Sequence, residues 1–428
     1  MTVSAPGGAR TGHPAAEAGA RRVATLAFAA QGMAVAAVYT TVPAVTEHLK
    51  LAPLLTTGTM VAVALMAGAG SFVGLAAIRR AGPVSTMRGA LLTAAAALTL
   101  IGWAPGKATV VCAYLLFGIA VGALDVGVNT RAAAIEHVYG RSIFGSFYAA
   151  WSVGGVVAAL LTAAVARLEW PVADGLDVQA GILAIVAACI RTHALPTSEV
   201  PSKPSEVSEP PQVSEPPDAS AQPPLGRRVW IRLLPFGLVL LVVYVVDSTV
   251  SAWSAVYLRQ TLAASLTVAP MAYAAYQGGT VVGRAATDRL VRRFGAVAVV
   301  RTAALLIAGA LAGMAAAPSW PLAVLAAGAV GLGASVLAPL CLASAARLRP
   351  AASAAILARL NLFNYAGVVT GGAVSGVLGS TGQFRLAYAV PAALALLLLA
   401  GARHFAPPPS PARTESPQVT QSTVPPKS

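Results

Sequence analysis

Apolar segments of membrane-spanning length recur along the whole chain and are separated by short stretches of glycine, proline and charged residues. A helix that crosses the hydrocarbon core of a bilayer needs roughly 20 apolar residues, with a range of about 17–25. The pattern predicts twelve such helices, at 23–45, 54–78, 87–105, 109–132, 143–167, 173–192, 230–257, 266–287, 296–317, 321–346, 352–379 and 383–404. We therefore expect an all-α membrane protein whose twelve transmembrane helices form two six-helix bundles.

The sixth segment is the weakest, because its cleanly apolar core spans only 178–190 and follows Asp174 and Asp177. The distribution of basic residues supports it. With the N-terminus in the cytoplasm, 24 of the 29 lysines and arginines lie in cytoplasmic segments and helix ends, and the outer side holds only Lys50, Lys107, Arg167, Arg259 and Arg385. This asymmetry follows the positive-inside rule.

Removing the sixth helix would turn the second half of the chain over. Arg284, Arg289, Arg292 and Arg293 would then face outward, against the same rule. We therefore expect twelve helices, both termini in the cytoplasm, and a multi-pass protein of the cytoplasmic (inner) membrane.

Residues 195–226 are rich in proline, serine and glutamate and have no apolar periodicity. Such a segment cannot bury enough apolar surface to offset its ordering entropy, so we expect a flexible cytoplasmic linker. The predicted organisation is a disordered tail at 1–22, a six-helix bundle at 23–192, a disordered linker at 193–229, a second six-helix bundle at 230–404 and a disordered tail at 405–428. Two halves with equal numbers of spans are typical of an alternating-access transporter.

The composition excludes a soluble globular protein, because 57% of the residues are hydrophobic and only 10% are charged, against about 25% charged in soluble domains. The net charge of +14 does not indicate a nucleic-acid partner, since the basic residues lie in short loops between apolar runs. The potential metal ligands are scattered: Cys112, Cys189, Cys341, His13, His48, His137, His193 and His404. We therefore expect no metal, no cofactor and no enzymatic activity, which would need such ligands clustered at one membrane face.

Two acidic residues lie well inside predicted spans, where an ionised side chain costs at least ~2.5–3.5 kcal/mol on insertion scales. Asp125 is on the fourth helix with Asn129 one turn later on the same face, and Asp247 is past the middle of the seventh. One interpretation is proton coupling, in which each carboxylate takes and releases a proton as the cavity changes sides. The other is structural: Asp125 would pair with Arg131 or Arg79 and brace the inner gate, and Asp247 would bond to helix hydroxyls.

Other polar and aromatic residues inside the spans are candidates for lining a central substrate cavity. They are Gln31, Tyr39, Asn129, Tyr148, Trp151, Trp253, Tyr257, Tyr273, Tyr276, Gln277, Asn361, Asn364 and Tyr365. Hydrogen bonding or packing between helices is the alternative role for each of them. Trp253 and Tyr257 also lie near the outer interface, where an aromatic belt is expected.

The predicted loop between the eighth and ninth helices, residues 283–295, reads GRAATDRLVRRFG. It resembles the signature loop of the major facilitator superfamily, in which a glycine precedes an acid–arginine pair, further basic residues and a glycine. In that family the acid caps and pairs charges that lock the cytoplasmic gate. The matching residues here are Gly283, Asp288, Arg289 and Arg293. The duplicate segment at 74–82 has lost the acid.

A second resemblance is to the fucose-permease-like branch of that superfamily. It is carried by Gly122 to Asn129, Glu136, Gly140-Arg141, Ser146 to Tyr148, Trp151-Ser152, and Asp247 with Ala252 to Leu258. In the fucose permeases, an acid four residues before an asparagine on the fourth helix is implicated in proton coupling and the sugar site, and Asp125 and Asn129 match that pair. Those permeases carry another acid on the first helix, which is absent from 23–45, so sugar specificity does not carry over.

The sequence therefore predicts a secondary active transporter that moves a small-molecule substrate by alternating access, coupled to protons. Import by symport and export by antiport use the same fold, so a proton-antiport efflux pump for a drug or secondary metabolite is the alternative to sugar-like uptake. A non-transporting sensor would normally carry a folded soluble domain, which the linker does not resemble. We expect a monomer whose partners are the solute, protons and the lipid bilayer, with no nucleic acid.

Overall fold

The computed structural model describes residues 14–139, 143–190, 227–348 and 353–405, and all regular secondary structure in these ranges is helical. The first half contains α1 (Pro14–Leu49), α2 (Pro53–Gly102), α3 (Lys107–Tyr139), α4 (Phe144–Arg167) and α5 (Val172–Cys189). The second half contains α6 (Arg227–Gln260), α7 (Met271–Phe294), α8 (Ala296–Ala316), α9 (Trp320–Ala346), α10 (Ser353–Ser380), α11 (Phe384–Gly401) and a short 3₁₀ segment (Ala402–Phe405).

Two of the segments expected to be disordered contain the start of a helix. α1 begins at Pro14, inside the segment expected as a tail, and α6 begins at Arg227, inside the expected linker. The disorder expected for the rest of the linker and for the outer parts of both tails falls outside the described residues.

The helix α2 contains two of the predicted spans. A straight helix of its 50 residues would be about 75 Å long, far more than a hydrocarbon core of about 30 Å. The helix is interrupted at Gly82, whose φ of 80° lies in the left-handed region, where glycine carries no steric penalty. Pro83 follows, and its fixed φ and missing N–H suit the first turn of the second part.

Ten helices in the described ranges are long and apolar enough to cross a membrane, including α5, which corresponds to the doubtful sixth span. The α-helix outside this set is α7, whose second half carries Arg284, Asp288 and three further arginines. Counting α2 as two passes and including α7 gives the twelve passages expected from the sequence.

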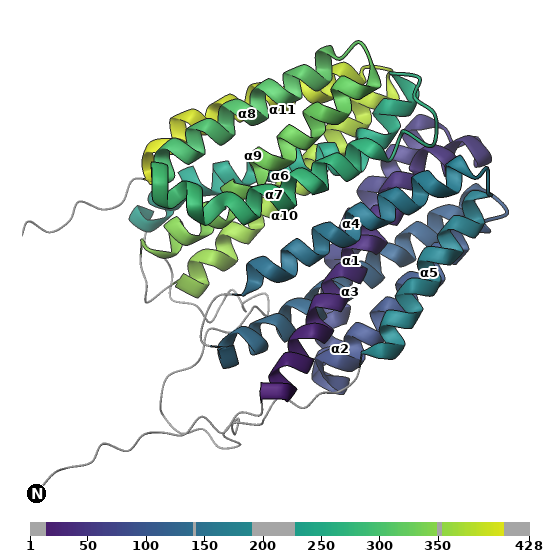
Figure 1. Cartoon of the computed structure of the whole chain (residues 1–428), viewed down its shortest axis with the longest axis horizontal. Coiled ribbons are helices and arrows are strands. Elements are labelled where there is room, and N and C mark those ends of the chain that lie inside the picture. Colours follow the sequence, from purple (N-terminus) through teal and green to yellow (C-terminus); the bar gives the residue numbers. More distant parts are fainter. Residues whose placement is uncertain (1–13, 140–142, 191–226, 349–352, 406–428) are drawn as a thin grey trace, which may run out of the picture.

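The two halves repeat the same packing. In the first half α1 packs on α4 and α2 on α3, and in the second half α6 packs on α10 and α7 on α9. The halves meet where α4 packs on α7, α2 on α10 and α1 on α6. Figure 1 shows them as two bundles side by side. We name the end where α1, α4 and α6 begin the linker end, and the end where α1 and α6 finish the distal end.

Glycines allow the backbones of paired helices to touch. A Cβ atom on Gly122 of α3 would lie 1.9 Å from the carbonyl oxygen of Ala67 of α2, and one on Gly154 of α4 would lie 1.9 Å from that of Ala29 of α1. Inside a membrane the hydrophobic effect does not drive helices together, so close packing through small residues does much of that work. These contacts make the first half a rigid bundle.

The substitution Gly122→Ala should lower the thermal stability of the purified protein, because α2 and α3 must separate to admit the methyl group. Overpacking of this kind costs about 1–3 kcal/mol, more than the helix propensity gained, about 1 kcal/mol. The matched control is Gly89→Ala in α2, where an added Cβ meets nothing within 4 Å and stability should stay equal or rise. Thermal unfolding followed by tryptophan fluorescence makes the comparison, and equal midpoints for the two variants would contradict the packing argument.

Candidate functional site

Asp125 lies on α3 and is hydrogen-bonded to a neutral residue of another helix. The side-chain nitrogen of Gln31, on α1, donates to Asp125 Oδ1 over 2.9 Å. Asn129 shares the face of α3 with Asp125, as predicted, but its amide donates to the Asp125 backbone carbonyl over 2.9 Å. In the described part of the chain Asp125 is hydrogen-bonded to Gln31 and not to Arg131 or Arg79, so the salt-bridge alternative for this acid gains no support.

Asp247 lies on α6 and accepts a hydrogen bond from a side chain of the neighbouring helix α7. The hydroxyl of Tyr276 donates to Asp247 Oδ1 over 2.5 Å. The hydroxyls on its own helix do not fill this role, because Ser251 and Ser254 are buried and have no hydrogen-bond partner among the described residues. The tyrosine contact joins two residues that the sequence analysis proposed separately for the proton site and the cavity.

Arg284, on α7, is a site residue that the sequence patterning did not single out. It was counted among the basic residues of cytoplasmic segments and helix ends, and the structure places it inside the helix and in contact with the other half. Its Nη1 donates to the backbone carbonyl of Tyr148 and to the hydroxyl of Ser152, both on α4 and both over 2.9 Å. Its guanidinium lies 5.7 Å from the centroid of the Tyr148 ring, and it is within electrostatic range of Asp247.

A set of tyrosines connects the two acids. Tyr148, Tyr244 and Tyr365 are within electrostatic range of Asp125, and Tyr244 is also within range of Asp247. Tyr244 was not among the predicted site residues. We name the group Gln31, Asp125, Asn129, Tyr148, Tyr244, Asp247, Tyr276, Arg284 and Tyr365 the central cluster.

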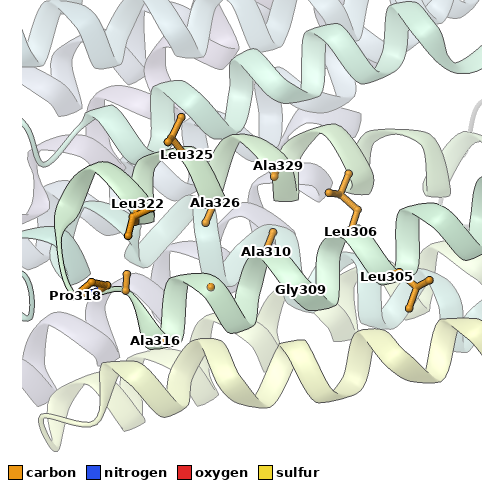
Figure 2. Close-up of a pocket in the computed structure, with 12 residues that line it drawn as sticks. Leu305, Leu306, Gly309, Ala310, Ala316, Pro318, Leu322, Leu325, Ala326 and Ala329 are labelled. Carbon is orange, nitrogen blue, oxygen red and sulfur yellow. The ribbon is translucent and has the colours of Figure 1, made fainter.

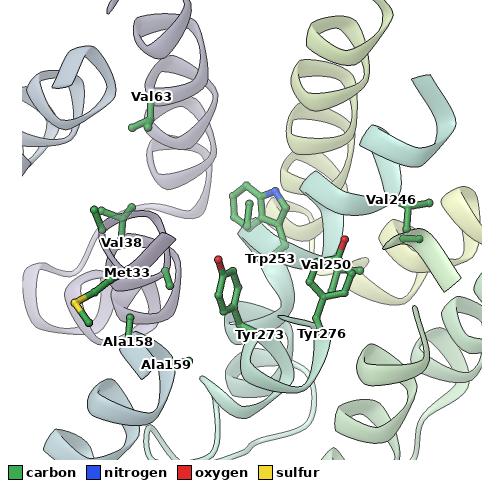
Figure 3. Packing of buried hydrophobic residues seen from close by; sticks show 14 of the residues in the cluster. Met33, Val38, Val63, Ala158, Ala159, Val246, Val250, Trp253, Tyr273 and Tyr276 are labelled. Carbon is green, nitrogen blue, oxygen red and sulfur yellow. The ribbon is translucent and has the colours of Figure 1, made fainter. Parts of the chain in front are cut away.

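Several other predicted residues lie along the seam between the halves. The rings of Tyr39 and Tyr273 are 6.5 Å apart, and Gln277 donates to the Tyr273 hydroxyl over 3.2 Å. Figure 3 shows Tyr273 between α1, which carries Met33 and Val38, and Tyr276. The structure therefore brings Tyr39 and Gln277 next to the central cluster.

The remaining cavity candidates have packing contacts. Trp253 is buried and donates its indole N–H to the Gly372 carbonyl over 2.9 Å, and Tyr257 is fully buried, so neither forms an aromatic belt. Trp151 is half-buried, and its backbone packs closely against Gly32 of α1. On α10, Asn364 donates to Asn361 over 2.9 Å.

The predicted gate loop is helical. α7 continues to Phe294, and the chain turns at Gly295, whose φ is 78°. Gly283 packs against Leu332 and Ser335 of α9 inside the second half. Asp288, Arg289 and Arg293 are exposed at the linker end of α7, and the Arg293 guanidinium lies over the Phe294 ring. A gating role for these residues stays a prediction.

Two contacts join the halves at the distal end. Arg259 of α6 forms a two-pronged salt bridge with Glu47 of α1, with Nε 2.5 Å and Nη2 3.1 Å from the two carboxylate oxygens. The hydroxyl of Thr57 of α2 donates to the Gly376 carbonyl of α10 over 3.0 Å. We name these four residues the distal clamp.

A surface groove of about 610 Å³ lies away from the central cluster, between α8 and α9 (Figure 2). Its lining residues are all apolar or small, and Leu325 and Leu305 among them are exposed. None of these lining residues offers a polar side chain to a solute. In the described part of the chain, no three His, Cys, Asp or Glu side chains gather in a way that could hold a metal ion.

Comparison with known proteins agrees with this architecture. Residues 236–428 match the sequence model of the Major Facilitator Superfamily. An uncharacterised MFS-type transporter of Yersinia pestis is 26% identical over 296 residues, which cover 69% of this chain and 72% of the relative. Membrane protein MosC of Rhizobium meliloti is 27% identical over 303 residues, covering 71% of this chain and 68% of the relative.

Solved transporter structures share the fold. The nucleoside transporter NupG, as a D323A mutant, superposes with a TM-score of 0.67 at 12% identity and covers 91% of this chain and 99% of its own. A bacterial homologue of the human lysosomal transporter Spinster, in an inward-facing and occupied conformation, gives a TM-score of 0.63 at 15% identity and covers 90% and 95%. The solved structures show that this chain has the fold of these transporters, and its second half is similar to the Major Facilitator Superfamily model, which together support a membrane transporter.

Proposed function

We propose that this protein is a secondary active transporter that moves a small polar solute across the cytoplasmic membrane by alternating access, coupled to protons through Asp125 and Asp247. The observation that carries the proposal is the central cluster. It brings one acid from each half, together with Arg284, into a single polar group where the halves meet.

The charges of the cluster support proton coupling. Buried charges are costly unless they are paired or neutralised. Asp247 and Arg284 lie within electrostatic range and have opposite charges, so they balance one another. Asp125 has only neutral hydrogen-bond partners in the described part of the chain. Burial without an opposite charge favours the protonated, uncharged form of a carboxyl. We therefore assign the transported proton first to Asp125, with Asp247 as the acid that balances Arg284.

The side chains around the acids support a polar solute. Tyr148 and Tyr365 are 40% and 53% exposed although they lie on helices of the cluster, so part of each side chain is accessible. Hydroxyl and amide groups would bond a hydroxyl-bearing solute, and the rings would stack on its apolar faces. This lining favours a polar solute over a lipophilic drug.

The distribution of basic residues assigns the linker end to the cytoplasm. On that assignment the distal clamp lies on the outer side, and we propose that it holds the two halves together there. Alternating access requires the clamp to open while the linker ends of the halves come together.

Reconstituted protein with a pH-sensitive dye inside the vesicles tests the proton role. A panel of sugars, nucleosides and cationic amphiphiles is added outside, and at least one solute should drive proton movement in the wild type. Asp125→Asn should abolish that movement, because the amide cannot exchange a proton. The sign of the pH change distinguishes symport from antiport.

The matched control is Asp174→Asn, an acid in the first turn of α5 at the distal end, which should keep wild-type proton movement. Size-exclusion chromatography confirms that both variants are folded. Solute-driven proton movement at the wild-type rate in Asp125→Asn would reject this acid as the coupling site.

The distal clamp yields a conformational prediction. Glu47→Gln removes the charge from a partly exposed two-pronged bridge, and such exposed pairs contribute roughly 0.2–1 kcal/mol. A loss of about 1 kcal/mol, the upper end of this range, would shift the equilibrium between the closed and the open distal end about fivefold. Pulsed electron paramagnetic resonance between spin labels at Leu54 and Gln260, in a variant whose three cysteines are replaced by serine, should show a larger population of long distances.

The control for this measurement is Arg385→Gln. Arg385 is also exposed near the distal end, but it donates to the Ala315 carbonyl within its own half over 2.8 Å. Its distance distribution should match the wild type. If Glu47→Gln also matches the wild type, the bridge does not stabilise this state.

A further inference from the structure

Gln31 has one polar atom that the described contacts leave unsatisfied. The side chain is only 4% exposed on α1. Its Nε2 donates to Asp125 Oδ1 over 2.9 Å, but its Oε1 is buried without a hydrogen-bond partner among the described residues. Leaving a buried acceptor unsatisfied costs about 1–3 kcal/mol, so a partner for this oxygen is expected in some state of the protein.

The chemistry of Asp125 supplies that partner. An ionised carboxylate only accepts hydrogen bonds, whereas a protonated carboxyl also donates one O–H. An amide and a protonated carboxyl are complementary: the amide N–H donates to one carboxyl oxygen, and the carboxyl O–H donates to the amide oxygen. The first of these two bonds is already present between Gln31 and Asp125.

We propose that Gln31 is the positioning residue for the coupled proton, and that it forms a two-bond acid–amide pair with protonated Asp125. Release of the proton breaks the bond to Gln31 Oε1 and leaves the bond from Nε2. The inference rests on the proposed function, because it assumes that Asp125 exchanges a proton, and it adds a residue that recognises the protonated form.

The other groups near Asp125 do not offer the same pairing. The Asn129 amide nitrogen donates to the Asp125 backbone carbonyl and also reaches the Asp125 side chain, but the Asn129 oxygen already accepts from the Tyr148 hydroxyl over 3.3 Å. The titratable neighbours of Asp125 are the hydroxyls of Tyr148, Tyr244 and Tyr365, from α4, α6 and α10. The close contact between Gly32 and the Trp151 backbone fixes the position of α1 beside α4. Gln31 is therefore held in place to meet the proton.

Infrared difference spectroscopy of the reconstituted protein tests the pair, with pH as the only variable. The wild type should show the carbonyl-stretch band of a protonated carboxyl that disappears as the pH rises, and Asp125→Asn should lack this band. Gln31→Met keeps the side-chain volume and removes both hydrogen bonds, so the band should persist at a higher frequency. Gln31→Leu provides a second variant with the same expected shift.

The matched control is Gln277→Met. Gln277 is a second buried glutamine with an unsatisfied oxygen, but it bonds to Tyr273 and not to an acid, so the Asp125 band should keep its wild-type frequency. An Asp125 band that is unchanged in both Gln31 variants would overturn the acid–amide pair while leaving the proton role of Asp125 intact. The absence of any Asp125 band in the wild type would instead reject the proton site itself.

Discussion

The central constraint on this protein is the cost of charge inside a membrane. Asp125, Asp247 and Arg284 all lie on helices that cross the bilayer, and each would be strongly unfavourable against lipid. They are placed instead where the halves meet, and each is satisfied by a hydrogen bond from or to another helix. The bonds of Asp125 and Asp247 stay within one half each, and the bonds of Arg284 to α4 cross between the halves, so Arg284 links the charged site to the interface.

The helices could be predicted from the sequence because each depends on local composition. Apolar length identifies a span, and the asymmetry of lysine and arginine correctly retained the weak sixth segment, which is α5. The same charge counting did not single out Arg284. A count by segment treats every arginine near a helix end alike, whereas Arg284 lies ten residues before Phe294, about 15 Å deeper along the helix. The depth of a residue within a helix was the signal that could have separated it from Arg289 and Arg293.

The site could be predicted only as far as single helices determine it. The one-turn spacing of Asp125 and Asn129 correctly put them on one face, but the partner of Asp125 is Gln31, 94 residues away. Tyr276 meets Asp247 across 29 residues of sequence, and Arg284 meets Ser152 across 132. Such pairs depend on how helices pack, and no periodicity within one helix reveals them. The loop expected at 283–295 is helical as far as Phe294, because the family motif that predicted it carries no information on where α7 ends.

A change in the protonation of Asp125 can affect the contact between the halves only through residues that cross it, and Arg284 is such a residue. Gln31 and Asp125 belong to the same bundle, and the backbone contacts of Gly32 and Gly154 lock α1 to α4, so a change in their hydrogen bonds cannot by itself rock the halves. Tyr148, whose carbonyl accepts from Arg284, is in electrostatic range of Asp125. In the described part of the chain Arg284 is in electrostatic range of Asp247 and Tyr148 but not of Asp125. On this proposal Tyr148, which contacts Arg284 and is in range of Asp125, is the residue through which a change of protonation at Asp125 reaches the link between the halves.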